Sequence, residues 1–238
     1  MAGTYAAPDL LADTAWLAEH LGDPGMVIVE MGTKAEEFEA GHIPGAVRCP
    51  SAQIKGTGDA DLRLVAPPAE AKALFESLGV GDDTLVVAYD RIRNRDASRL
   101  WWVLGYYGHA NVKVLDGGWK KWTAEGRPPE SGPGASGPGA PSSSATFTPA
   151  VHPETASTVE TLTAAIGRSG TVIWDIRTPE EFSGEADRGN ARKGHVPGAV
   201  HLEWVDLVND DDTFKDAGEL RALASGLGIT PETAVHVY

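Results

Sequence analysis

The sequence contains a single cysteine, Cys49, among its 238 residues. One thiol cannot form a disulfide within the chain and cannot supply a CxxC metal pair, so neither kind of site is expected. No apolar run approaches the roughly 18 residues that cross a bilayer, and the N-terminus lacks the basic-then-apolar pattern of a signal peptide. We therefore expect a cytoplasmic protein that does not associate with membranes.

Basic residues are also scarce, with 20 Lys and Arg against 34 Asp and Glu and a formal net charge of −14. This balance argues against nucleic acid and anionic membrane surfaces as partners, because both are bound through basic patches. The hydrophobic share of 42% and charged share of 23% are ordinary, and they predict a packed core. The length suits about two domains.

An internal duplication is the most informative feature that is present. The heptapeptide GHIPGAV at 41–47 returns as GHVPGAV at 194–200, and SLGVGDDTLVVAY at 77–89 is matched by GLGITPETAVHVY at 226–238. A repeat of this length indicates two globular domains and excludes a solenoid of short units. In both halves an apolar run that ends in an acid precedes the heptapeptide.

A segment rich in Pro, Gly and Ser separates the two repeats. It reads RPPESGPGASGPGAPSSSA at 127–145, a composition that buries little apolar surface and is typical of a linker. We accordingly predict an N-terminal domain over 5–126, a linker over 127–154 and a C-terminal domain over 155–238.

Each repeat alternates strand and helix patterns. The first predicts strands over 26–31, 84–89 and 112–115 and helices over 69–78 and 97–107. Thr14 is expected to cap an earlier helix, and Trp101 to face the core together with Leu100 and Leu104. The alternation predicts an α/β fold in which each domain is a parallel sheet flanked by helices. Ligands of such sheets bind at the carboxyl ends of strands, here after Glu30, Tyr89, Asp175 and Tyr238.

The heptapeptide histidines, His42 and His195, favour a structural interpretation over a catalytic one. The glycines and the proline of the motif suit a tight loop, which a ring N–H could hold in place through a nearby carboxylate. Cys49 is interpreted as a small buried hydrophobe, because neither a helix N-terminus nor a basic pair lies beside it in the sequence.

Two clusters of basic residues stand out in this acidic chain: Arg91, Arg93 and Arg95 in the first repeat, and Arg177, Arg188, Arg192 and Lys193 in the second. The first cluster is either a solvated charge run or a basic rim near an anion site. The second follows Asp175 in a place where guanidinium groups would suit a sulfur oxyanion or a carboxylate.

Three motifs together resemble the tandem-domain rhodanese family of thiosulfate and 3-mercaptopyruvate sulfurtransferases. They are the duplicated GHxPGA, the run over 87–122 that includes AYD, ASRLWW, LGYYGH and VLDGGWKKW, and WDIRTPEEF at 174–182. The resemblance covers nearly the whole chain except the linker, and it implies two rhodanese-like domains.

The resemblance also implies where the nucleophile belongs. Asp90 fits the inactive copy, in which an aspartate replaces the cysteine, and the active cysteine is expected directly after Tyr238, opening a six-residue loop. The second domain is thus expected to be incomplete, truncated before its active-site loop, with no catalytic residue inside the chain. Three explanations stay open: an interruption of the sequence at a modified cysteine, which we favour, a deliberate cut, or a natural end.

The activity implied is transfer of sulfane sulfur through a cysteine persulfide to cyanide or a thiol, without a metal or organic cofactor. Arg188 and Arg192 would bind the anionic donor, and Asp175, Arg177 and His195 would support the loop. Acidic residues at 180–181 replace an arginine of the family pattern, which leaves the donor open. The alternatives are a non-catalytic sulfur-carrier or partner-binding module and, less favoured, a phosphatase of the same fold with a longer loop.

Overall fold

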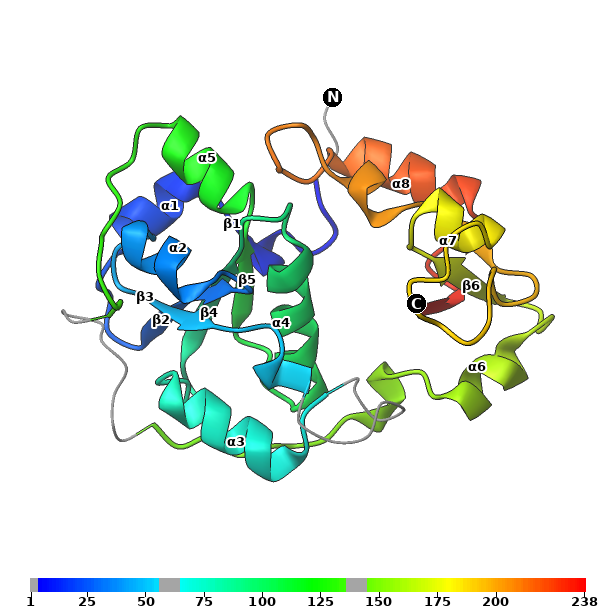
Figure 1. Ribbon diagram of the computed structural model, residues 1–238, viewed down its shortest axis with the longest axis horizontal. Helices are drawn as coiled ribbons and strands as arrows, with labels where there is room; N and C mark the ends of the chain where they lie inside the picture. Colours follow the sequence, from blue (N-terminus) through cyan, green and yellow to red (C-terminus); the bar gives the residue numbers. More distant parts are fainter. Residues whose placement is uncertain (1–3, 56–64, 136–144) are drawn as a thin grey trace. The chain divides into compact units, whose positions relative to one another are not determined.

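The computed structural model describes residues 4–55, 65–135 and 145–238, which divide into two compact units (Figure 1). The N-terminal unit comprises residues 7–155 together with 210–213, and the C-terminal unit comprises 4–6, 156–209 and 214–238 within the described chain. Both units hold a parallel sheet flanked by helices, so the predicted fold class is confirmed.

The N-terminal unit is built on five parallel strands in the order β1-β5-β4-β2-β3. In that order they are Leu11–Ala12, Val112–Leu115, Leu85–Tyr89, Met26–Met31 and Ala46–Cys49. One face is covered by α1 (Thr14–Glu19), α2 (Ala35–Ala40) and α5 (Gly118–Ala124), and the other by α3 (Pro68–Ser77) and α4 (Arg95–Tyr106) (Figure 1). Short 3₁₀ turns lie at Pro8–Leu10, Gln53–Lys55 and Pro153–Thr155.

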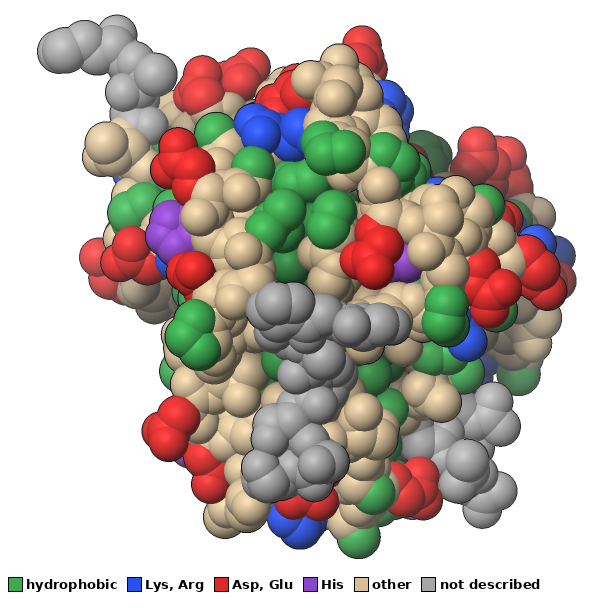
Figure 2. All heavy atoms as spheres, turned by 90° about the vertical axis from the view of Figure 1, so that its left-hand side faces the viewer, with side chains coloured by type: hydrophobic (Ala, Val, Ile, Leu, Met, Phe, Trp, Pro, Cys, Tyr) green, Lys and Arg blue, Asp and Glu red, His purple; other side chains and the backbone are tan. Residues whose placement is uncertain are grey.

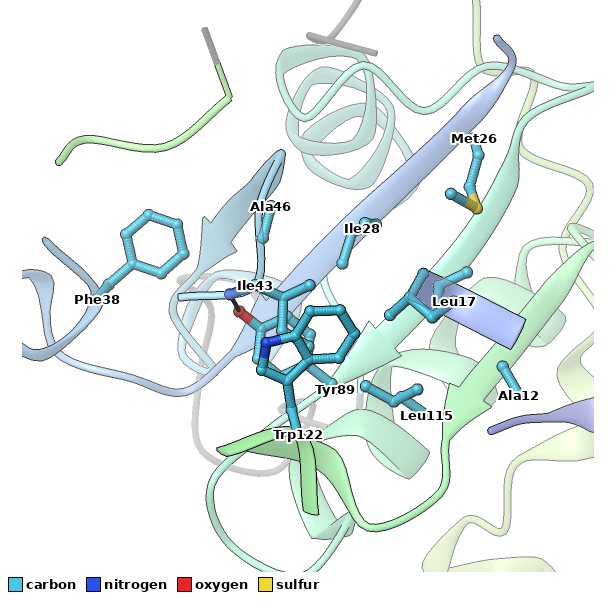
Figure 3. Packing of buried hydrophobic residues seen from close by; sticks show 11 residues of the cluster. Ala12, Leu17, Met26, Ile28, Phe38, Ile43, Ala46, Tyr89, Leu115 and Trp122 are labelled. Carbon is cyan, nitrogen blue, oxygen red and sulfur yellow. Dashed lines mark hydrogen bonds between the residues drawn. The ribbon is translucent and has the colours of Figure 1, made fainter. Parts of the chain in front are cut away.

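The core of this unit explains why its central strands are apolar at nearly every position. Leu17 of α1, Phe38 of α2 and Trp122 of α5 are buried against strand residues that include Ile28 and Tyr89 (Figure 3). On the opposite face, α3 and α4 bury their own apolar residues. With both faces covered, alternation with polar residues is lost, and each large side chain contributes about 1.5–3 kcal/mol of burial energy.

Two local predictions are wrong. Trp101 is 38% exposed, because Leu100, Val103 and Leu104 occupy the buried stripe of α4 and the next residue after Leu100 turns out of it. The N-cap of α1 is Asp13, whose carboxylate accepts a hydrogen bond from the Trp16 backbone N–H at 2.7 Å. Aspartate caps a helix at least as well as threonine.

The described parts of the predicted linker pack on the N-terminal unit. Glu130 and His42 exchange two backbone hydrogen bonds of 2.9 Å, and the Ala135 N–H donates to the Ala46 carbonyl at 3.0 Å. Further on, Phe147 is buried in the same unit. Residues 136–144, the centre of the predicted linker, lie outside the described residues, and the division into domain, linker and domain stays a proposal.

The C-terminal unit repeats part of this arrangement. Its strands β7 (Val200–His201), β6 (Thr171–Asp175) and β8 (Ala234–Val237) are parallel and follow the order β7-β6-β8, as β3-β2-β4 do in the first unit. The helices are α6 (Val159–Ala165), α7 (Pro179–Ser183) and α8 (Ala217–Gly226), with a 3₁₀ turn at Trp204–Leu207. Because β2 pairs Glu30 with Arg48 and β6 pairs Asp175 with His201, the two acids occupy equivalent strand ends.

The surface agrees with the acidic composition. Figure 2 shows acidic side chains dispersed over one face of the molecule. Within the described part of the chain, no helix is both long and apolar enough to cross a bilayer.

Candidate active site

A buried acid ties together the strand ends of the N-terminal unit. Glu30, at the end of β2, accepts hydrogen bonds from the Tyr89 hydroxyl and from Arg91 Nε, the latter at 2.6 Å. The Tyr89 hydroxyl also accepts one from the Ile43 N–H at 3.0 Å (Figure 3), and Arg91 donates to the Gly41 carbonyl. Burial, together with the charge of Glu30, raises the pKa of Tyr89 well above its ordinary value. The network thus joins β2 and β4 to the GHIPGAV loop.

The C-terminal unit contains the same network from equivalent positions. Asp175, at the end of β6, binds Arg177 through Nε–Oδ1 and Nη2–Oδ2 contacts of 3.0 and 2.5 Å. Tyr238 bonds to Asp175 and accepts the Val196 N–H at 2.9 Å, while Arg177 donates to the Gly194 carbonyl at 2.9 Å. Burial opposes ionisation of Asp175, but the hydrogen bonds from Arg177 and Tyr238 hold its pKa below the ordinary value.

The arginine reaches this network from two different places in the chain. Arg177 lies two residues after the acid of β6, whereas Arg91 lies two residues after the tyrosine of β4. Gly32 is the first-unit counterpart of Arg177; its φ is +77°, and a Cβ at this position would lie 2.4 Å from Asp96 Oδ2, so a side chain here would strain the backbone and displace the Asp96 carboxylate. The guanidinium group is therefore retained while its position in the sequence changes.

The loop after β4 surrounds the carboxylate of Asp90. Oδ1 accepts the N–H groups of Ile92 and Asn94 at 2.8 and 3.0 Å, and Oδ2 accepts those of Asp96 and Ala97 at 2.8 and 2.9 Å. Burial raises the pKa of Asp90, and these four donors act in the opposite direction. The loop is a cradle for an anion, made of backbone N–H groups at the N-terminus of α4, and the protein's own carboxylate fills it.

The other arginines of the first cluster are also paired. Arg93 Nε lies 3.5 Å from Asp212 Oδ1, and Arg95 Nε lies 3.1 Å from Asp96 Oδ1. With Arg91 bound to Glu30, the cluster is neither a free charge run nor an open basic rim.

The two heptapeptide histidines make one shared contact in different surroundings. His42 Nδ1 donates to the Phe38 carbonyl and His195 Nδ1 to the Phe182 carbonyl, both at 2.8 Å, and each ring stacks on that phenylalanine at 4.0 and 3.8 Å between centroids. The partner is a backbone carbonyl, where the sequence suggested a carboxylate. His42 is buried and His195 is exposed.

Arg188 and Arg192 lie on the insertion between α7 and the second heptapeptide. Arg188 has a left-handed φ of 49°, its side chain is 65% exposed, and its Nε lies 3.8 Å from Glu181 Oε2. Arg192 is exposed and makes no hydrogen bond or ion pair with any described residue. Donor binding by these two residues stays a proposal.

Cys49 does not have the environment of a nucleophile. It is fully buried at the end of β3, and burial raises the pKa of its thiol to about 12 despite the nearby charge of Arg48. The thiolate is the reactive form, so this residue is inert near neutral pH. Among residues 4–55, 65–135 and 145–238, no group of three or more His, Cys, Asp or Glu is placed to hold a metal ion.

Several site residues were not identified from the sequence. Glu30, Tyr89 and Tyr238 were placed only as strand ends, and Glu181 only as a departure from a family pattern. The sequence did contain a signal for them. Tyr89 and Tyr238 end the longer repeated segment in the two halves, and a polar residue that recurs at equivalent buried strand ends suggests a shared contact.

The chain is an α/β protein with two parallel-sheet units. In each unit an acid, a tyrosine and an arginine meet beside a GHxPGA loop, and in the N-terminal unit an anion cradle follows the end of β4. The model of the rhodanese-like domain matches residues 13–125 and 158–238, and the chain belongs to that family.

Curated relatives and a solved structure agree with this membership. The sulfur carrier protein TtuD of Thermus thermophilus is 34% identical over 246 residues, covering 98% of this chain and 83% of that protein. A thiosulfate sulfurtransferase of Corynebacterium glutamicum is 32% identical, covering 98% and 78%. The 3-mercaptopyruvate sulfotransferase SseA of Escherichia coli superimposes with a TM-score of 0.83 at 27% identity, covering 96% of this chain and 87% of that one.

Proposed function

We propose that the protein is a cytoplasmic sulfurtransferase that moves sulfane sulfur from thiosulfate or 3-mercaptopyruvate to cyanide or a thiol. A cysteine thiolate attacks the outer sulfur of thiosulfate, the S–S bond breaks, and sulfite leaves with the electron pair. With 3-mercaptopyruvate, the C–S bond breaks and the carbon takes up a proton to give pyruvate. The acceptor then attacks the outer sulfur of the persulfide and releases the thiolate.

One observation carries the proposal. In the first repeat the residue after Tyr89 sits in a cradle of four N–H groups, and Tyr238 is the equivalent of Tyr89 in the same network. The proposed nucleophile is therefore the residue that follows Tyr238. A thiol in such a cradle is expected to have a pKa below ~8.5, since N–H groups and a helix N-terminus favour the thiolate.

Residues of the C-terminal unit have supporting roles in this proposal. Asp175, Arg177 and His195 would hold the strand ends and the GHVPGAV loop, while Arg188 and Arg192 would attract the anionic donor. Attraction is needed because the protein carries a net charge of −14.

A second candidate is a sulfur-carrier or partner-binding role without turnover. The name of the Thermus thermophilus relative, a sulfur carrier protein, favours it over the phosphatase alternative. Both candidates share the persulfide, and they differ in whether a small thiophile releases its sulfur.

The test compares the 238-residue chain with a version that continues past Tyr238 as the gene encodes it. We expect thiocyanate from thiosulfate and cyanide only with the longer chain, and loss of activity when the residue after Tyr238 is changed from cysteine to serine. Cys49→Ser is the matched control and should leave the rate unchanged. A persulfide that forms but is not released to cyanide would support the carrier role. Activity that depends on Cys49 would contradict the proposal.

A further inference from the structure

The insertion in the second repeat carries additional cations. Twelve positions separate Glu30 from His42 in the first repeat, and twenty separate Asp175 from His195 in the second. The cations of this longer segment, apart from the buried network's own arginine, are Arg188, Arg192 and Lys193. Lys193 pairs with Asp187 at 3.6 Å.

Four residues form a line of alternating charge that leads from the buried network to this insertion. Asp175 binds Arg177 as described, and Arg177 Nη1 lies 4.0 Å from Glu181 Oε1. The other carboxylate oxygen of Glu181 lies 3.8 Å from Arg188 Nε. The side chain of Glu181 is only 14% exposed, so it is held between a constrained arginine and an exposed one. Arg177 itself lies 5.1 Å from the Tyr238 ring, at the end of β8.

The described residues of the first repeat contain no such line. Glu37, which precedes Phe38 as Glu181 precedes Phe182, is exposed, and its side chain has no ion-pair partner among the described residues. The acid is therefore present in both repeats, but only the second supplies an arginine for it.

We propose that Glu181 is a specificity-determining residue that acts by neutralising Arg188; this inference rests on the proposed function. The pairing leaves Arg192 as the cation of the insertion that has no partner among the described residues. Coulomb attraction scales with the charge of the ligand, so the pairing lowers affinity for a dianion such as thiosulfate more than for the monoanion 3-mercaptopyruvate.

The experiment measures anion binding and turnover separately. The dissociation constants of thiosulfate and 3-mercaptopyruvate are determined at low salt by NMR titration of the full chain and of Glu181→Gln. The variant is expected to bind thiosulfate roughly three- to five-fold more tightly, the size of a surface ion pair, with a smaller gain for the monoanion. In the active enzyme the thiosulfate KM should fall while kcat stays unchanged.

Matched variants separate charge pairing from a structural role of α7. Glu185→Gln removes an exposed carboxylate of the same segment and should change nothing, and Glu181→Asp should retain most of the pairing. Arg188→Ala should abolish the gain of Glu181→Gln, because the two residues act as a coupled pair. As single variants, Arg188→Ala should weaken thiosulfate binding less than Arg192→Ala does. This comparison tests the neutralisation of Arg188 even if Glu181→Gln does not fold.

The inference would be overturned if Glu181→Gln still tightened thiosulfate binding in the Arg188→Ala background. It would also be overturned if Glu181→Gln changed the dissociation constants of thiosulfate and 3-mercaptopyruvate equally. Absence of sulfur transfer by the wild-type enzyme from either donor would instead refute the proposed function, while the anion titrations would still report on the Glu181–Arg188 pair.

Discussion

The two units hold similar acid–tyrosine–arginine networks in which the ion pairs are equally buried, although the strands beside them differ in exposure: the side chains of Glu30 and Asp175 are 0% exposed, and those of Arg91 and Arg177 are 24% and 25% exposed. In the N-terminal unit β4 lies between β2 and β5, and its Val86, Val87 and Tyr89 are fully buried. In the C-terminal unit Val235 and Val237 of β8 are 38% and 47% exposed. The network is a shared feature of the two repeats, formed by strand register and the GHxPGA loop.

The surroundings of the heptapeptide differ in a similar way. In the N-terminal unit the chain around Glu130 covers the loop, the Gly45 N–H donates to Glu130 Oε2 at 2.7 Å, and His42 Nε2 lies 3.8 Å from the same oxygen. The equivalent His195 is open to solvent. Among the described residues, the first heptapeptide is thus covered by a later segment of the chain, whereas the second is not.

The largest expected effect is on the alkylation rate of Cys49. This rate tests whether the N-terminal unit has a reactive thiol. With a pKa of about 12, its thiolate fraction near pH 8 is small, so alkylation by iodoacetamide should be about a thousand-fold slower than for an ordinary thiol of pKa ~8.5. Mass spectrometry of the native and urea-unfolded chain gives the two rates. Rapid native labelling would remove the contrast between an inert and an active repeat.

The next effect compares the two buried acids. Glu30→Ala should lower the free energy of unfolding of its unit by about 3–5 kcal/mol, because it leaves the Arg91 charge without its partner in a buried setting. Asp175→Ala should cost about as much, since Asp175 and Arg177 are as buried as Glu30 and Arg91. Hydrogen exchange measured separately for β2–β4 and β6–β8 reports on each unit. A much smaller loss for Asp175→Ala would show that the rest of the sheet, and not the burial of the ion pair itself, sets the cost.

The smallest expected effect tests why the network arginine of the first repeat lies at position 91 and not at position 32, the counterpart of Arg177. Gly32 and Gly45 have φ values of +77° and +79°, but only at Gly32 would a Cβ meet other atoms, with Gly45 open. Gly45→Ala should cost about 1–2 kcal/mol for the left-handed backbone, and Gly32→Ala should cost more because of the contact with Asp96. Urea denaturation of both variants measures the difference. Similar values would mean that steric exclusion does not keep a side chain from position 32.

Strand positions and the repeat were predictable because they depend on local pattern. The strands at 26–31 and 112–115 agree with the structure residue for residue, since continuous apolar runs bounded by turns suit strands buried on both faces. Helix faces were less predictable: the sequence predicted that Trp101 faces the core with Leu100 and Leu104, but packing on the sheet buries Leu100 and Leu104 and leaves Trp101 exposed.

The repeated heptapeptide and the α/β class could be read from the sequence alone, because spacing and residue type record them directly. Tertiary structure alone decided which charges meet. Arg91 and Arg177 occupy equivalent places from non-equivalent sequence positions, and the pairing of Glu181 with Arg188 depends on the path of an insertion. Such contacts join residues through space, and the free energy of an ion pair depends on distance and burial, neither of which a linear pattern contains.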